Sequence, residues 1–280
     1  MKDGVVECVG IYRSFFDWIL ISMRIYAFFV PFFVVLAGIA GYYLRLSERA
    51  NVFDAITGLP DRNAATTIWL IVLSVVFMIC VLIFAIRVTL TYKALPGFES
   101  AFGTDPTAYP IIFILIGISW LVGTYLYFSG LNAYGAVTVN DISFIIFSAL
   151  AAISTTFFAI EMYQDSRRNA PYALSVIPTV FMCFWLIFIY RQNASNPILL
   201  SYVYQCLAVV ASALSFYFTS GFLYGKPAPG KATVTYYAAI FFSIVTLADD
   251  HPIGIKLVFV ALIAANIVYS ALLVRNLQRK

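Results

Sequence analysis

The chain contains eight stretches of at least 17 residues without a single Asp, Glu, Lys or Arg. A helix needs roughly 20 apolar residues to cross the hydrocarbon core of a bilayer, and each stretch is at or near that length. The stretches cover residues 25–44, 63–86, 106–140, 142–160, 169–190, 192–225, 232–248 and 257–274. The sequence therefore predicts an all-α, integral membrane helical bundle of about eight transmembrane helices without a soluble domain.

Composition excludes several other classes of protein. Charged residues make up 11% of the chain, against about a quarter in a soluble domain. This excludes a soluble catalytic domain and a nucleic-acid-binding module, so we expect the lipid bilayer and no nucleic acid as partner. The four cysteines, Cys8, Cys80, Cys183 and Cys206, are scattered, which argues against a disulfide scaffold or a metal cluster. We expect no cofactor and no metal site.

The eight spans form one predicted transmembrane domain over residues 25–274. They lie near 25–45, 67–88, 109–130, 142–162, 172–190, 198–222, 232–248 and 255–274. The span at 232–248 is short and closely bounded by Lys231 and Asp249, which leaves its full crossing open. Residues 1–24 are either an amphipathic interfacial helix or an inward extension of the first span. Residues 275–280 form a tail.

The basic residues predict the orientation of these spans. With the N-terminus inside, twelve Lys and Arg residues fall on the inner segments and five on the outer segments. An excess of Lys and Arg marks the cytoplasmic side of a membrane protein. We therefore expect a multi-pass membrane protein with both termini in the cytoplasm. The five outer residues are Arg45, Arg49, Arg62, Arg191 and Lys256.

The outer loops collect several acidic residues and the single histidine of the chain. Carboxylates and imidazole are suitable ligands for a divalent cation, but these side chains come from separate loops whose convergence the sequence leaves open. Asp249 and Asp250 precede Pro252, where a carboxylate that caps a helix is expected, and capping is the favoured interpretation. The residues are Asp54, Asp61, Asp141, Asp249, Asp250 and His251.

No span carries an ionisable residue near the middle of the membrane, which argues against a proton-coupled pump or a retinal protein. Neutral polar residues instead form a stripe on the sixth span, joined by one residue of the eighth. Helix packing through small residues explains such a stripe and is favoured, while a groove that lines a solute path is the alternative. The stripe consists of Ser201, Gln205, Ser212, Ser215 and Thr219, with Asn266 on the last span.

Three short segments carry a resemblance to a known group of proteins. They are Thr57-Gly58-Leu59-Pro60, the segment from Tyr190-Arg191 through Asn196-Pro197 to Tyr202-Val203-Tyr204, and Ala248-Asp249-Asp250-His251. In this order the chain resembles uncharacterised multi-pass membrane proteins of Gram-positive anaerobic bacteria, most closely over residues 180–250. The resemblance implies a bacterial plasma membrane and brings no activity, substrate or catalytic residue.

Two functional hypotheses follow from these features. The first is a transporter, or a transport-associated subunit, for a neutral or amphipathic small solute. The alternative is a non-catalytic membrane partner, such as a sensor, an assembly factor or a subunit bound to a partner membrane subunit. An intramembrane enzyme is not expected, because serine proteolysis needs a nucleophile with a buried base and the only histidine lies in an outer loop.

Overall fold

The computed structural model describes residues 29–52, 64–92, 98–103, 108–133, 137–163, 172–194 and 198–277. Within these ranges the chain is helical and contains no β-strand. The long helices are Phe29–Asn51, α2 (Ala65–Thr91), α4 (Ala108–Ala133), α5 (Val139–Tyr163), α6 (Tyr172–Gln192), α7 (Val203–Leu223), α8 (Pro229–Thr246) and α9 (Ile253–Asn276). Two short elements, α3 (Phe98–Phe102) and the 3₁₀ helix η1 (Leu199–Ser201), complete the described structure.

The predicted all-α membrane bundle is confirmed. Among the described residues, seven helices are long and apolar enough to cross a membrane, and α8 is a further long helix beside them. Each predicted span coincides with one of these helices, with ends that differ by a few residues. The expected alternatives for residues 1–24 lie outside the described residues.

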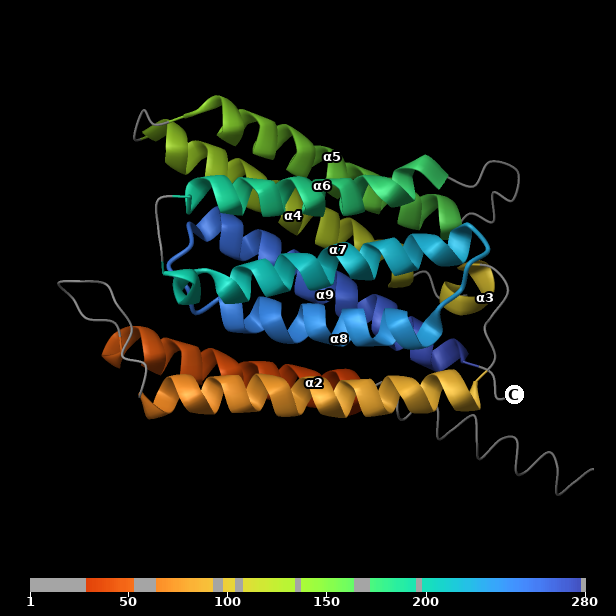
Figure 1. Cartoon of the computed structure of the whole chain (residues 1–280). Helices are drawn as coiled ribbons and strands as arrows, with labels where there is room; N and C mark the ends of the chain where they lie inside the picture. The colour runs from red at the N-terminus through yellow and green to blue at the C-terminus, as the bar shows by residue number, and fades with distance from the viewer. Residues whose placement is uncertain are drawn as a thin grey trace, which may run out of the picture.

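Helix α8 lies at the centre of the bundle. Nearly all of its side chains are buried, and it packs against α2, α7 and α9, with which it runs side by side (Figure 1). Because other helices surround it, α8 can bury Tyr236, Tyr237 and Ser243 as well as apolar residues. This central position is consistent with its absence from the seven described helices that are apolar enough to cross a membrane.

Small residues allow the helices to approach closely. A Cβ added to Gly38 or Gly41 would lie 2.7 Å from the side chains of Ile244 and Val245, so the Phe29–Asn51 helix packs directly on α8. Helices α4 and α9 cross where Gly123 faces Gly254, with backbone against backbone. This is the packing that small residues provide in membrane bundles.

Two ends of the bundle can be distinguished. The Phe29–Asn51 helix, α4, α6 and α8 end where η1 lies, at the left of Figure 1. We call this the η1 end. Helix α3 and the last turn of α9 lie at the opposite end, where the Asn276 side chain donates hydrogen bonds to the carbonyls of Ala101 and Gly103, each at 3.0 Å.

Candidate functional site

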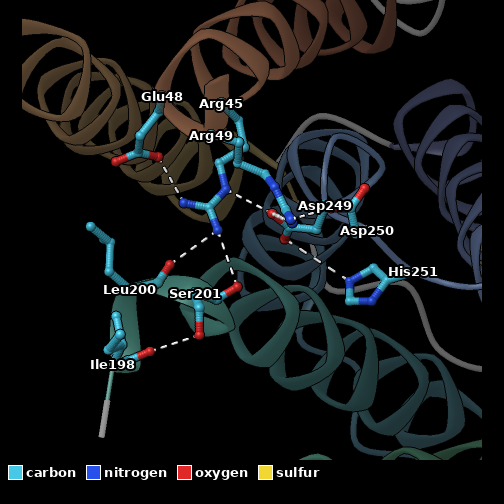
Figure 2. Close-up of polar contacts among 9 residues, drawn as sticks. All are labelled: Arg45, Glu48, Arg49, Ile198, Leu200, Ser201, Asp249, Asp250 and His251. Carbon is cyan, nitrogen blue, oxygen red and sulfur yellow. Dashed lines mark hydrogen bonds and ion pairs between the residues drawn. The ribbon is translucent and has the colours of Figure 1, made fainter. Parts of the chain in front are cut away.

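A buried arginine lies at the η1 end of the bundle. The helix predicted to end at residue 45 continues to Asn51, and Arg45 is fully buried within it. Its Nε donates to Asp249 Oδ1 at 2.8 Å and its Nη1 to Glu48 Oε2 at 2.7 Å. Its Nη2 donates to the carbonyls of Leu200 and Ser201 at 3.0 and 3.2 Å (Figure 2). Arg45 therefore joins its own helix to η1 and to the segment after α8.

A second arginine extends this network toward solvent. Arg49 Nη1 donates to Asp249 Oδ1 at 3.3 Å, and Nη2 donates to Asp250 Oδ2 at 2.6 Å. Helical spacing places Glu48 and Arg49 three and four residues after Arg45, on one face of the helix. We call Arg45, Glu48, Arg49, Asp249 and Asp250 the Arg45 cluster; Figure 2 shows its members converging from two segments about 200 residues apart.

The expectation that Asp249 and Asp250 cap the last helix is wrong. Helix α9 begins after Pro252, and no side chain in the described structure caps its first turn. Asp249 instead follows a turn that closes α8, in which its amide donates to the Thr246 carbonyl at 3.0 Å. Two arginines from another helix draw its carboxylate away from the α9 amides. A charge pair formed across the fold therefore overrides the local capping preference.

A pocket of about 450 Å³ lies against the Arg45 cluster. We call it the Asp249 pocket. Its polar lining residues are Arg49, Tyr127, Gln192, Asn193, Ser201, Tyr202, Gln205, Asp249, Asp250 and His251. Its apolar lining residues are Leu131, Trp185, Phe188, Pro252 and Ile255. Trp185 is two helical turns before the end of α6, so the pocket reaches about 10 Å into the bundle.

Asp249 and His251 line this pocket, and each has one buried side-chain atom without a hydrogen-bond partner among the described residues. His251 Nε2 lies 4.0 Å from Asp249 Oδ2, and neither atom finds a hydrogen-bond partner among the described residues. Glu48 Oε1, on the far side of Arg45, is the third such atom of this region. Buried polar atoms are normally paired, so atoms that lack a partner require an explanation, and a ligand or water in the adjoining pocket would supply one.

The electrostatic surroundings keep His251 neutral near pH 7. Burial lowers the pKa of its imidazole to about 4, and the positive charges of Lys256 and Arg49 act in the same direction. Burial also raises the pKa of the Asp249 carboxyl, while the charges and hydrogen bonds of Arg45 and Arg49 oppose that rise. The pocket thus presents a neutral imidazole beside a carboxylate that is held by two guanidinium groups.

The predicted polar stripe divides into two parts. Ser201 and Gln205 line the Asp249 pocket. Ser212, Ser215 and Thr219 lie deeper on α7 and are buried between helices, where Thr219 shares a 2.5 Å hydrogen bond with the Tyr236 hydroxyl of α8.

Asn266 is also buried away from the pocket, and its Nδ2 donates to the Leu262 carbonyl within α9 at 2.8 Å. The η1 end of the stripe therefore belongs to the Asp249 pocket, and the remainder contributes to helix contacts, where Thr219 also lines a small cavity of about 10 Å³.

The outer-face acidic residues converge only in part. Asp249, Asp250 and His251 meet at the pocket, whereas Asp141 accepts hydrogen bonds from the Tyr127 hydroxyl at 2.8 Å and from the Thr138 amide at 3.0 Å. Tyr127 links Asp141 to the pocket wall. Asp54 and Asp61 lie outside the described residues, and within the described ones no three His, Cys, Asp or Glu side chains gather in a way that could hold a metal ion.

The sequence reasoning missed Arg45 and Glu48 as buried residues. It placed Arg45 at the outer end of the first span and Glu48 in the loop that follows, because the uncharged stretch stops at residue 44. A signal was present, since Arg45, Glu48 and Arg49 continue the helical spacing. Arg45 and Glu48 also form an i, i+3 ion pair, which supports a longer helix. The partner Asp249, 204 residues away, gave no local signal.

Comparisons of the chain with protein-family models, with curated proteins and with solved structures give no match. The geometry of the Asp249 pocket and the Arg45 cluster therefore provides the basis for a functional proposal.

Proposed function

We propose that this protein is a transporter, or a transport-associated subunit, that takes up a neutral or amphipathic small solute through the Asp249 pocket. The observation that carries the proposal is the pocket itself, about 450 Å³ in volume and lined by both aromatic and polar side chains. Small-molecule sites have this size and this mixture of residues, and they commonly lie between the helices of bundles.

The position of the pocket supports the same role. It opens at one end of the helices, with the exposed Asp250 at its rim and the fully buried Trp185 at its floor. We propose that both termini lie in the cytoplasm, on the basis of the basic-residue bias, and that the membrane is a bacterial plasma membrane, as the resemblance implies. In that orientation the pocket faces outward, where a solute first meets the protein. We further propose that the protein acts without catalysis.

One observation favours the alternative role of a membrane partner. Helix α2 packs against α8, and it presents a long apolar face that includes Trp69, Val75 and Ile83, each more than half exposed. Lipid covers such a face in a protein that acts alone, whereas a second membrane subunit would cover it in a complex. The test below separates these two cases.

The test is native mass spectrometry of the protein extracted from its own membrane in mild detergent. We expect a single polypeptide that carries a small molecule of defined mass. Gln205→Leu, which alters the pocket, should reduce the occupancy at least tenfold. Ser212→Ala, on the same helix but outside the pocket, should retain it. The identified molecule, isotopically labelled, should then enter proteoliposomes that contain the wild-type protein.

Other outcomes would overturn the proposal in defined ways. A second polypeptide at fixed stoichiometry, without a bound small molecule, would favour the partner role. A bound molecule whose occupancy is equal in wild type and Gln205→Leu would place its site elsewhere. A bound molecule that proteoliposomes do not take up would make the protein a binding component rather than a transporter.

A further inference from the structure

We propose that the Asp249 pocket selects an amphipathic solute with a primary ammonium group, bound between Asp249 Oδ2 and His251 Nε2. This inference rests on the proposed function and names the chemical class of its solute. The apolar part of the solute would lie against Trp185 and Phe188, deeper in the same pocket.

The spacing of the two acceptor atoms fits a single donor nitrogen. Asp249 Oδ2 and His251 Nε2 are 4.0 Å apart. A nitrogen at a hydrogen-bond distance of about 2.8 Å from both would see them at an angle of about 90°, near the angle between two N–H bonds of an ammonium group. Both atoms are buried and lack partners among the described residues, and the Asp249 side chain is only 1% exposed.

The number of donor hydrogens distinguishes an ammonium group from a hydroxyl group. A neutral imidazole can offer Nε2 as an acceptor, and the carboxylate oxygen is always an acceptor when ionised. An alcohol has one O–H and can satisfy one of the two atoms, whereas an ammonium group satisfies both and keeps a third N–H for solvent or a side-chain oxygen. A single ammonium group can therefore donate a hydrogen bond to each of the two atoms, Asp249 Oδ2 and His251 Nε2.

The charges of the Arg45 cluster favour a cation over an anion. Two guanidinium groups face three carboxylates, and each guanidinium is already hydrogen-bonded to at least one of them. A carboxylate or phosphate solute would have to displace one of these internal pairs. Lys256 acts on His251 from the first turn of α9 but does not line the pocket.

The aromatic lining favours an organic amine over an inorganic cation. Trp185, Phe188, Tyr127 and Tyr202 all line the pocket. Aromatic rings attract ammonium groups and also bury apolar carbon, which a hydrated metal ion cannot exploit. An amine that carries an aromatic or aliphatic group of modest size matches both halves of this surface.

The experiment compares three probes of similar shape on the full-length protein in detergent. They are 2-phenylethylamine, 2-phenylethanol and 3-phenylpropanoate, which present an ammonium, a hydroxyl and a carboxylate group on the same apolar part. Isothermal titration calorimetry near neutral pH should give an affinity for the amine at least tenfold higher than for the alcohol, and weaker binding still for the carboxylate.

Matched variants test the assigned atoms. Asp249→Asn should abolish the preference for the amine, whereas Ser212→Ala, which lies on α7 outside both the pocket and the Arg45 cluster, should retain it. If Asp249→Asn fails to fold, His251→Phe serves as the second variant. It removes the Nε2 acceptor without touching an arginine pair, and it should reduce amine affinity severalfold.

Each contrary result has a defined meaning. Equal or tighter binding of the alcohol or carboxylate would overturn the ammonium assignment and would indicate that water alone satisfies the two acceptors. Absence of binding by all three probes would overturn it as well. The proposed function is judged separately, since a non-amine solute recovered from the native membrane and taken up by proteoliposomes would refute this inference while supporting transport.

Discussion

At the scale of single residues, Arg45 decides the structure of the η1 end. Its guanidinium is fully buried, bonded to two carboxylates and two carbonyls, and its Cζ lies 5.0 Å from the centroid of the Tyr204 ring. A buried charge is tolerated only when it is paired and hydrogen-bonded in this way. Removal of the arginine would leave two buried carboxylates, Glu48 and Asp249, without their principal partner.

Arg45→Met is therefore expected to destabilise the folded protein by about 3–5 kcal/mol, the cost of breaking a buried ion pair from one side. Arg49→Met is the matched control, because Arg49 is 29% exposed and its pairs are partly solvated, so a loss of about 1 kcal/mol or less is expected. SDS titration in mixed micelles measures both values. Equal losses of unfolding free energy for the two variants would show that the buried Arg45 stabilises the fold no more than the partly exposed Arg49.

The lowered pKa of His251 predicts that the stability of the folded protein depends on pH. The pKa of His251 is about 4 in the folded protein, below the ordinary 6.5, so the unfolded state binds more protons between these two values. The contribution of neutral His251 to the free energy of unfolding is complete above pH 6.5 and is lost as the pH falls toward 4. The charged groups that surround it are Asp249, Asp250, Arg45, Arg49 and Lys256.

We expect the melting temperature of the wild type in detergent to fall between pH about 7 and pH about 5, as the linkage relation requires. His251→Gln should show a smaller fall over the same interval, since it removes one group that must remain unprotonated in the folded state. Parallel curves for the two proteins would indicate that other groups account for the acid sensitivity.

At the scale of elements, the crossing of α4 and α9 depends on two glycines. A Cβ on Gly123 would lie 2.8 Å from the Gly254 carbonyl oxygen, and a Cβ on Gly254 would overlap the backbone of Tyr127 and Gly123. Backbone atoms cannot move aside as a flexible side chain can. The two helices must therefore separate or rotate if either glycine acquires a side chain.

Gly254→Ala is expected to cost about 1–3 kcal/mol or more, the usual penalty for overpacking a tight contact. Gly130→Ala on α4 is the control, because a Cβ there meets nothing within 4 Å and alanine favours a helix over glycine by about 1 kcal/mol. Thermal unfolding in detergent should lower the melting temperature of the first variant and leave that of the second unchanged or raised. Equal melting temperatures for the two variants would contradict the close crossing.

At the scale of the whole molecule, the alternation of eight long helices in the described structure places the Asp249 pocket and the α7–α8 connection at opposite ends. Ala194, beside the pocket end of α6, and Lys226, between α7 and α8, are both exposed. The basic-residue bias predicts that the first is outside the cell and the second inside.

Single cysteines test this orientation. In a background without Cys8, Cys80, Cys183 and Cys206, Ala194→Cys should react with a membrane-impermeant maleimide in intact cells. Lys226→Cys should react only after the cells are lysed. The reverse pattern would place the Asp249 pocket on the cytoplasmic side and would exclude uptake from outside through it.

The sequence by itself determined the all-α membrane bundle and the approximate positions of its long helices, because a bilayer imposes a length and an apolar character that are local properties of the chain. It also identified Gln205 and Ser201, since polar residues at helical spacing in an apolar segment are conspicuous. It did not determine which part of the stripe reaches a pocket, because neighbouring helices decide that.

Only the tertiary structure decided the partners of the charged residues. Local pattern assigned Asp249 to the start of α9 and Arg45 to the outer end of the first span, but the fold brings their side chains within 2.8 Å across 204 residues. The electrostatic and hydrogen-bond energy of that pairing exceeds the small preference for a helix cap, and it becomes available only once the Phe29–Asn51 helix has packed on α8. The Asp249 pocket is therefore a product of long-range packing, which no single segment encodes.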